Sequence, residues 1–246
     1  MTTTELDFIC PDWPAPPNVR AASTTRIGGV SEKPWNGLNL ATHVGDEPAH
    51  VQRNRELLAQ ALALPAEPAW LTQVHGTNSC DAAGAQPACE ADASFATAAG
   101  QVCVVMTADC LPVLFCNRQG TRVAAAHAGW RGLAGGVLEA SVAGFDDPAD
   151  VLAWLGPAIG PQAFEVGEEV LAAFTGHEPQ AAQAFVANRP GHWLADIYQL
   201  ARLRLKAAGV SHIYGGGLCT FADAERFYSF RREPVTGRMA SLIWLD

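Results

Sequence analysis

The sequence predicts an α/β fold in which helices cover both faces of a mixed β-sheet. Segments with a strand pattern alternate with segments with a helix pattern along most of the chain, which is typical of this class. Apolar runs at 111–117 and 121–126 are separated by a short polar turn and have the form of a hairpin. Because a hairpin pairs antiparallel neighbours, we expect the sheet to be mixed.

Each expected element has a local signal. Asp46 is a candidate N-cap for the first helix, with Pro48 in its first turn. Gly176 and Gly209 follow the patterns of two later helices and predict their ends. Small and polar residues at 76–92 indicate a loop. In chain order we expect a helix within 43–64, strands over 69–76, 101–108, 111–117 and 121–126, a helix over 133–145, a strand over 150–160, and helices over 168–176 and 196–209.

Composition limits the classes of protein that the chain can represent. The 246 residues contain no repeat or linker-like segment, so we expect a single domain over 1–246. A net charge of −9 repels phosphate backbones and argues against nucleic acid as a partner. No apolar run approaches the roughly 18 residues needed to cross a membrane. Seven cysteines without a CxxC pair, and no signal-peptide pattern, favour a cytoplasmic protein with reduced thiols.

Three residues with metal-binding side chains follow predicted strands: His75, Cys110 and His127. Ligands bind at strand ends in open α/β sheets, so these side chains are candidates for one site. Two histidines and one cysteine match a catalytic zinc that keeps its fourth position open. Spacing alone also allows a hydrolase in which a Cys110 thiolate is the nucleophile.

Seven blocks of the sequence carry a family resemblance. They extend from about Ser23 to the C-terminus and read STTRIGGVS, GLNLATHVGDEP, WLTQVHG, ADCLPVLF, AAHAGWRGLAGGVLEASV, LGPAIGPQAFEVG and CTFADAERFYSFRREPVTGR. In content and order these blocks resemble the YfiH-like family, the laccase-domain proteins described as purine nucleoside phosphorylases. The resemblance implies a three-layer α/β/α sandwich and zinc bound by His75, Cys110 and His127. It also implies phosphorolysis of adenosine, inosine and methylthioadenosine, with deamination of adenosine as a second reaction.

These reactions suggest roles for further residues. Phosphorolysis requires a phosphate whose charge is balanced by a metal or by arginine, and a proton donor for the departing purine. Deamination requires an activated water and a carboxylate that transfers protons. We expect Asp109, Cys110 and His127 to form the catalytic group. Asp109, which is adjacent to Cys110, would supply that carboxylate or orient a histidine ligand. Arg26 and Arg231 are candidate phosphate or ribose ligands, and we expect Arg231 and Arg232 on opposite faces of a strand.

Alternative functions stay open at this stage. A His₂Cys set with an axial methionine also suits copper, as in a laccase-like polyphenol oxidase. Only two methionines beyond the initiator and seven histidines without an HxH pair argue against the several coppers of a laccase. A Cys–His hydrolase or deamidase and a non-catalytic zinc-binding domain are further alternatives. For the favoured function we expect purine nucleosides and inorganic phosphate as partners, and a monomer or homodimer.

Overall fold

A computed structural model describes residues 5–84 and 89–246, and it confirms the α/β fold around a mixed sheet. Its central sheet has six strands in the order β12-β8-β6-β7-β4-β3. Strand β6 pairs antiparallel with both neighbours, whereas β12 with β8 and β3 with β4 are parallel. The strands are β3 (Ser79–Asp81), β4 (Ala93–Ala96), β6 (Leu111–Asn117), β7 (Val123–Ala128), β8 (Val151–Leu155) and β12 (His212–Gly215).

A second sheet lies against one face of the first. It is antiparallel, with the order β1-β2-β13-β5. Side chains of β5 alternate, so that Cys103 and Val105 share an apolar cluster with Leu114 of the six-stranded sheet. The β layer of the sandwich is therefore two sheets thick. The strands are β1 (Phe8–Ile9), β2 (Val19–Thr24), β5 (Val102–Thr107) and β13 (Met239–Leu245).

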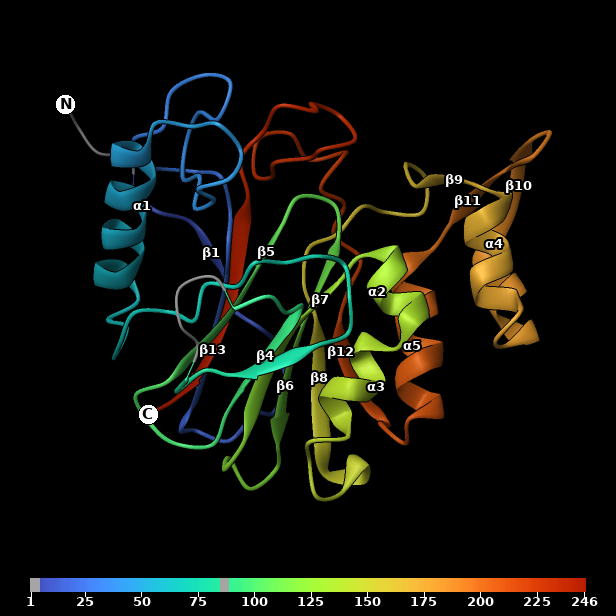
Figure 1. Cartoon of the computed structure of the whole chain (residues 1–246), viewed down its shortest axis with the longest axis horizontal. Coiled ribbons are helices and arrows are strands. Elements are labelled where there is room, and N and C mark those ends of the chain that lie inside the picture. Colours follow the sequence, from blue (N-terminus) through green and yellow to red (C-terminus); the bar gives the residue numbers. More distant parts are fainter. Residues whose placement is uncertain (1–4, 85–88) are drawn as a thin grey trace.

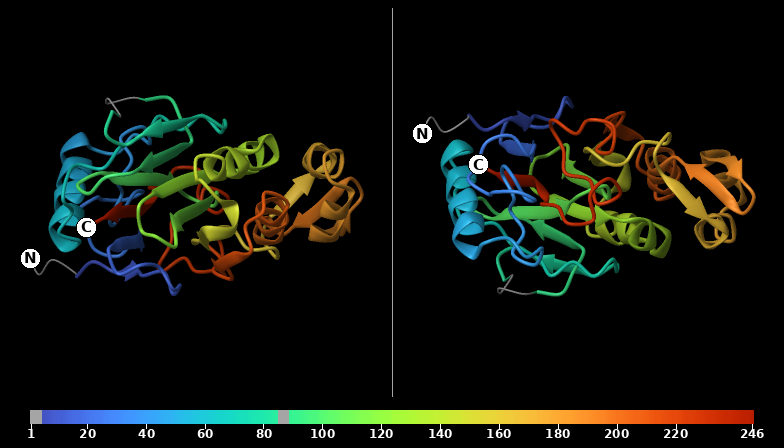
Figure 2. Two further views of the ribbon diagram at one scale, coloured as in Figure 1. Left: turned by 90° about the horizontal axis from the view of Figure 1, so that it is seen from below. Right: turned by 90° about the horizontal axis from the view of Figure 1, so that it is seen from above.

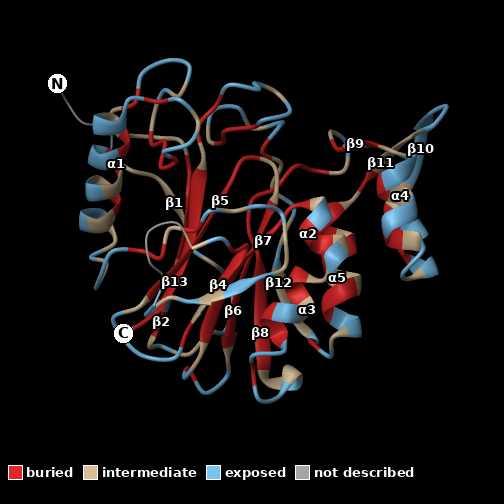
Figure 3. Cartoon of the chain, in the orientation of Figure 1, coloured by how far each residue is buried: buried red, intermediate tan, exposed pale blue. Residues whose placement is uncertain are grey.

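Helices cover both outer faces of this double layer (Figure 1). Helix α1 (Pro48–Ala61) places Leu58 in a cluster with Val102 and Val104 of β5. On the other side, Leu138 and Leu205 pack against the six-stranded sheet through residues such as Phe115. The central strands β5, β6 and β7 are buried along nearly their whole length, whereas α1 has an exposed outer face (Figure 3). The helices on this second side are α2 (Trp130–Gly135), α3 (Val137–Val142) and α5 (Ile197–Ala207).

A small three-stranded sheet and α4 project at the α5 end of the molecule (Figure 2). The strand order is β10-β11-β9, all antiparallel. Within the described residues, no helix is both long and apolar enough to cross a membrane. The prediction of one domain over 1–246 stays a prediction. The elements here are β9 (Glu165–Gly167), α4 (Glu168–Thr175), β10 (Phe185–Arg189) and β11 (His192–Ala195), with a short 3₁₀ helix at Pro179–Ala184. A second 3₁₀ helix, at Pro148–Asp150, directly precedes β8.

The structure differs from the sequence-based expectations at several segments. The strand expected over 69–76 is reduced to an isolated bridge from Thr72 to Glu90. The helix expected over 133–145 begins at Trp130 and breaks at Gly136, whose φ of 103° is left-handed. Glu47, rather than Asp46, is the N-cap of α1.

The segment 76–92 and its cysteines also depart from expectation. Its composition predicts a loop, but its described part includes the short strand β3. Cys80 and Cys89 form a disulfide, so the prediction that all seven thiols are reduced is wrong for this pair. Two backbone contacts hold the segments that carry these cysteines. Cys80 lies in β3, which pairs with β4. The Cys89 carbonyl accepts a hydrogen bond from the Thr72 amide.

Candidate metal centre and its pocket

The structure brings the three predicted ligands together. The ligand atoms of His75, Cys110 and His127 all lie within 4.8 Å of one another. The Cys110 Sγ and His75 Nε2 atoms are 3.8 Å apart. Zn–S and Zn–N bonds of normal length at a tetrahedral ion put such atoms about 3.3–3.6 Å apart. The donor set and its spacing therefore fit one zinc-sized ion with small adjustments.

Each ligand comes from a different part of the fold. His127 lies near the end of β7, opposite Pro112 of β6. Cys110 ends the short turn from β5 to β6, and His75 lies in the irregular segment that replaces the expected strand. His75 has φ of 62°, a left-handed conformation that is uncommon for a residue with a side chain. The centre thus depends on irregular backbone as well as on strand register.

Gly129 explains why small residues follow His127. A Cβ atom built there would lie 2.7 Å from His75 Cδ2 and 3.0 Å from Cys110 Sγ. Real Cβ atoms do not approach other side chains so closely, so a larger residue would displace two of the three candidate ligands. The backbone therefore approaches the candidate ligands closely at this glycine.

The electrostatics of the cluster favour a thiolate at Cys110 and a protonated ring at His127, so a metal would have to displace a proton from His127. Burial opposes ionisation of Cys110, but His127 and His75 lower the pKa of its thiol to about 6. For His127, burial acts to lower the pKa, and the charges of Cys110 and Asp92 outweigh it and raise the pKa. At neutral pH, Cys110 is therefore a thiolate, which is the form that binds metals.

Asp92 is a functional candidate that the sequence analysis missed. Its side chain is fully buried, and its Oδ1 atom lies 2.7 Å from Nδ1 of His127. Burial opposes its charge, but hydrogen bonds from His127 and Gly76 keep the pKa of Asp92 below its ordinary value. The residue precedes β4, in a segment whose composition predicts a surface loop, so no sequence signal separates it from other loop aspartates.

A cavity of about 360 Å³ opens above the three candidate ligands. This size is in the range of small-molecule sites. Three arginines line it, namely Arg131, Arg231 and Arg238. The cavity therefore combines a candidate metal centre with concentrated positive charge in a chain of net charge −9. Its other lining residues are His43, Gln73, Met106, Thr107, Ala108, Asp109, Trp130, Ile159, Phe164, Ile197 and Phe230.

Asp109 lines this cavity, but its hydrogen bonds go to the C-terminal loops. Oδ1 accepts from the Thr220 hydroxyl at 2.6 Å. Oδ2 accepts from the Ser229 hydroxyl at 3.0 Å and from the Arg231 amide at 2.7 Å. These contacts favour a role in anchoring the loop that carries Arg231, and the proton-transfer role of Asp109 stays a prediction.

Arg231 lies in the cavity wall, whereas Arg26 does not. Arg231 is exposed, and its Nη1 atom donates to the carbonyl oxygen of Glu165 at 2.9 Å. Residues 230–232 form a turn, so the strand expected there is wrong, and with it the assignment of Arg231 and Arg232 to opposite strand faces. The turn arises because the Asp109 carboxylate accepts the Arg231 amide.

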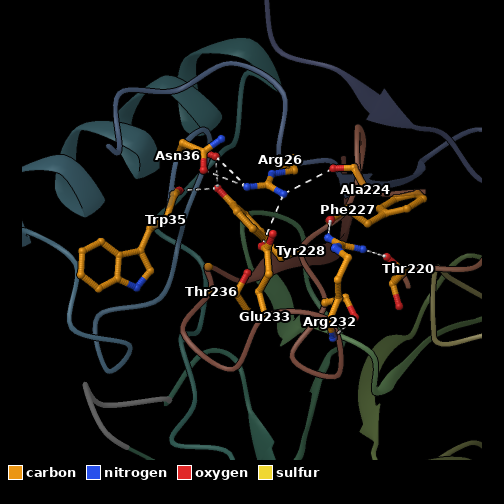
Figure 4. A network of polar contacts seen from close by, with 12 residues as sticks. Arg26, Trp35, Asn36, Thr220, Ala224, Phe227, Tyr228, Arg232, Glu233 and Thr236 are labelled. Atoms are coloured by element: carbon orange, nitrogen blue, oxygen red, sulfur yellow. Dashed lines mark hydrogen bonds and ion pairs between the residues drawn. The ribbon is translucent and has the colours of Figure 1, made fainter. Parts of the chain in front are cut away.

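The contacts of Arg26 and Arg232 hold loops together (Figure 4). The Arg26 guanidinium lies 4.6 Å from the Tyr228 ring and donates to the Asn36 side chain. Arg232 donates to the carbonyl oxygens of Thr220 and Phe227. Among the described residues, the cavity lining does not include Arg26, so its role as a substrate ligand stays a prediction that the cavity does not support.

Three lining residues have no signal in the sequence. The spacing between His43 and the other histidines follows no pattern, so the sequence gives no reason to assign it a role. Gln73 is held by a double hydrogen bond, since it donates to the Met106 carbonyl at 2.8 Å and accepts from its amide at 2.7 Å. Arg238 donates to the carbonyls of Thr236 and Gly237. All three reach the cavity through the tertiary fold, which single-sequence patterns do not encode.

The fold and this cluster define an α/β protein with a His-Cys-His candidate metal centre in a cationic cavity. A family model described as multi-copper polyphenol oxidoreductase laccase matches residues 20–246, and the chain belongs to that family. It is 57% identical over 240 residues to a protein of Escherichia coli named purine nucleoside phosphorylase YfiH, covering 97% of this chain and 98% of the relative.

Two further relatives agree with this assignment. A purine nucleoside phosphorylase of Pseudomonas aeruginosa is 56% identical over 97% of this chain and 98% of its own. The crystal structure of a Neisseria meningitidis protein superposes with a TM-score of 0.94 at 54% identity, covering 97% of this chain and 99% of that chain. The resemblance inferred from the sequence motifs is confirmed.

Proposed function

We propose that the protein is a zinc-dependent purine nucleoside phosphorylase. It would cleave adenosine, inosine and methylthioadenosine with phosphate to give the base and ribose 1-phosphate, and deaminate adenosine as a second reaction. The observation that carries this proposal is the cavity in which three arginines face a His-Cys-His cluster. Relatives named purine nucleoside phosphorylase over nearly the whole chain support the same reaction class.

The metal would be held by His75, Cys110 and His127, whose donor types and spacing fit zinc. When bound there, zinc would supply a Lewis acid that stabilises negative charge on oxygen. Gly129 leaves room for this arrangement, because any side chain at that position would collide with two of the ligands.

Phosphate binding would fall to the arginines of the cavity. Guanidinium groups are planar forks that bind phosphate oxygens in pairs. Burial lowers the pKa of Arg238, which means that its charge is poorly solvated and would be stabilised by an anion. The Arg231 side chain is fixed in direction by the Glu165 carbonyl. We therefore assign phosphate to the part of the cavity between Arg231 and Arg238.

The nucleoside would occupy the apolar part of the cavity. Trp130, Phe164 and Phe230 line it and would exclude water from a bound purine and ribose. The Arg131 guanidinium lies 4.3 Å from the centre of the Trp130 ring. Departure of the purine requires a proton at a ring nitrogen. Asp109, which the sequence analysis expects to transfer protons in deamination or to orient a histidine ligand, would also be the donor here.

Product analysis tests this function directly. Purified protein loaded with zinc is incubated with adenosine, with and without phosphate, and the products are separated by chromatography. We expect adenine only when phosphate is present and inosine in both cases, and loss of both products after chelation. Absence of adenine and hypoxanthine from the zinc-loaded protein in phosphate would contradict the proposal.

A copper oxidase is the second candidate, because Met106 lines the same cavity as the His-Cys-His cluster. Two histidines, a cysteine and a weak methionine ligand form typical copper sites. Metal analysis and a visible spectrum of the purified protein distinguish the candidates, since zinc is colourless and copper–thiolate centres are not.

A Cys–His hydrolase is favoured by one observation, the lowered pKa of Cys110. A thiolate nucleophile would keep its activity after chelation, whereas the proposed zinc enzyme would lose it. A non-catalytic zinc-binding domain would instead lose folding stability on chelation and would turn over no nucleoside.

A further inference from the structure

One buried carboxylate touches the elements that carry both histidine ligands. The Asp92 side chain is fully buried, and Asp92 lies directly before β4. Pairing of β4 with β7 sets Ala93 opposite Ala126, which brings Asp92 beside His127. The main-chain oxygen of Asp92 accepts the His127 amide at 2.7 Å, so backbone and side chain bind the same histidine.

The contact with the His127 ring determines which nitrogen can bind a metal. Oδ1 of Asp92 lies 2.7 Å from Nδ1 of His127, and a carboxylate that accepts hydrogen bonds requires a proton on that nitrogen. Nε2 is then the nitrogen with a free lone pair. Carboxylate partners of this kind fix the ring orientation of metal-binding histidines in many proteins.

The same carboxylate holds the backbone that aims His75. Three consecutive amides converge on it: His75 donates to Oδ1 at 2.9 Å, and Gly76 and Val74 donate to Oδ2 at 2.6 and 3.2 Å. His75 has a left-handed φ of 62°, which persists only where surrounding contacts enforce it. The three amides are such contacts, so Asp92 maintains the turn from which the His75 ring reaches Cys110.

We propose that Asp92 is a positioning residue that orients both histidine ligands and thereby sets the metal affinity of the centre. This inference rests on the proposed function, because it presupposes that the His-Cys-His cluster binds a metal. Asp109, the carboxylate expected from the sequence to orient a ligand, binds the C-terminal loops instead.

Asp92→Asn tests the proposal with little change in side-chain volume. All four donors around the carboxylate point at its two oxygens, so an amide group must turn its NH₂ toward at least one of them. If the NH₂ faces His127, it requires an unprotonated Nδ1 and shifts the ring proton to Nε2, the metal-binding nitrogen. If it faces Val74 and Gly76, the turn that carries His75 loses its acceptor. Both orientations weaken the centre.

The primary measurement is zinc affinity, by competition with a chromophoric chelator. We expect Asp92→Asn to bind zinc about 10- to 100-fold more weakly than wild type, the range found for partners of metal ligands. Asp46→Asn is the matched control, because Asp46 is also a buried carboxylate that accepts hydrogen bonds from Ser31, Asn39 and the Glu47 amide. Its zinc affinity should remain within twofold of wild type.

A spectroscopic measurement on the wild-type protein covers the case in which Asp92→Asn does not fold. Long-range ¹H–¹⁵N spectra of the zinc-loaded protein should show His127 protonated at Nδ1 and unprotonated at Nε2. A proton on Nε2 would overturn the inference, as would an Asp92→Asn affinity within twofold of wild type. A wild-type protein that binds no zinc would overturn the proposed function as well, so the two failures are distinguishable.

Discussion

The two turns that flank β6 differ in what they connect and in their chemistry. The turn after β6, within residues 118–122, takes its left-handed φ of 65° at Gly120, where no side chain is needed. The turn before β6, at residues 108–110, takes a left-handed φ of 87° at Asp109, a residue with a side chain. Asp109 binds the C-terminal loops, and its neighbour Cys110 lies in the candidate metal centre.

This difference shows where the chain accepts unfavourable backbone conformations. A glycine adopts a left-handed φ at no steric cost, whereas other residues lose roughly 1–2 kcal/mol. The cost appears at Ala63, which follows α1, and at His75 and Asp109. The latter two line the cavity, where a glycine would lack the side chain that the candidate site would use. The turn at Gly120 is an ordinary hairpin, whereas the turn at Asp109 and Cys110 places both residues in the lining of the candidate site.

The strongest test of this contrast is Cys110→Ala. Loss of one of three ligands should reduce zinc affinity more than about 100-fold, beyond the effect of changing a ligand's partner. Phosphate-dependent release of adenine from adenosine should be lost with it. Cys10→Ala, at an exposed position outside the cavity lining, is the control and should retain both. Full turnover by Cys110→Ala without bound metal would refute the proposed mechanism.

Alkylation of the metal-free protein tests the electrostatics of the same turn. The thiolate is the reactive form, so Cys110 should react with iodoacetamide with half-maximal rate near pH 6 and more slowly below it. At pH 7 the larger thiolate fraction is partly offset by the lower nucleophilicity of a low-pKa thiolate, so we expect a rate roughly 2- to 3-fold above that of an ordinary free thiol, and protection by zinc. Cys103 and Cys116, whose pKa values burial raises to about 12, should stay unmodified in the folded protein. Mass spectrometry identifies the modified residue, and a half-maximal rate shifted to the alkaline range of an ordinary thiol would contradict the predicted thiolate.

Asp109→Asn separates the anchoring role from proton transfer. Asn tolerates the left-handed conformation, but its NH₂ must face one of the donors from Thr220, Ser229 or Arg231. Loosening of the Arg231 loop should raise KM for phosphate about 10-fold, equivalent to about 1.4 kcal/mol, with zinc affinity unchanged. Turnover slowed by a factor of roughly 10²–10⁴ at unchanged KM would instead identify Asp109 as the proton donor.

The smallest effect is expected at the other turn. Gly120→Ala would place a Cβ atom at left-handed φ and against the Asn18 side chain. We expect a loss of about 1–2 kcal/mol in the free energy of unfolding, measured in urea, with unchanged zinc affinity. A loss of metal binding in this variant would show that the two turns are coupled, and the contrast between them would fail.

Local patterns are sufficient to predict the main helices and the strands β5, β6, β7 and β8, but not the other strands of the described residues. Apolar runs locate β5, β6 and β8, and glycine signals locate the ends of α4 and α5. The strand prediction for 69–76 is wrong, because the apolar pattern of Trp70 and Leu71 does not reveal that the amides of the following residues bind Asp92. The second sheet is also not predictable from local patterns, because β13 pairs with β2 across most of the chain length.

The candidate site is predictable in its ligands but not in its surroundings. His75, Cys110 and His127 are found from strand ends and from the family resemblance, since their chemistry is visible in the residue type. Asp92 and Arg238 are missed, because an aspartate in a loop and an arginine near the C-terminus gain meaning only from register and loop closure. Arg26 is a candidate by residue type alone. Its guanidinium contacts the Tyr228 ring outside the cavity lining, and its role as a substrate ligand stays a prediction.

The connection from β5 to β6 passes from the four-stranded sheet to the six-stranded one, and Cys110 lies at that crossing. Apolar side chains hold the two sheets together, and such contacts have no preferred direction. Coordination bonds do have direction. An ion shared by Cys110 and His127 would therefore add directed bonds between the start of β6 and the end of β7, at the point where the chain enters the six-stranded sheet, so that the candidate ligands and the register of these two strands would be held by the same bonds.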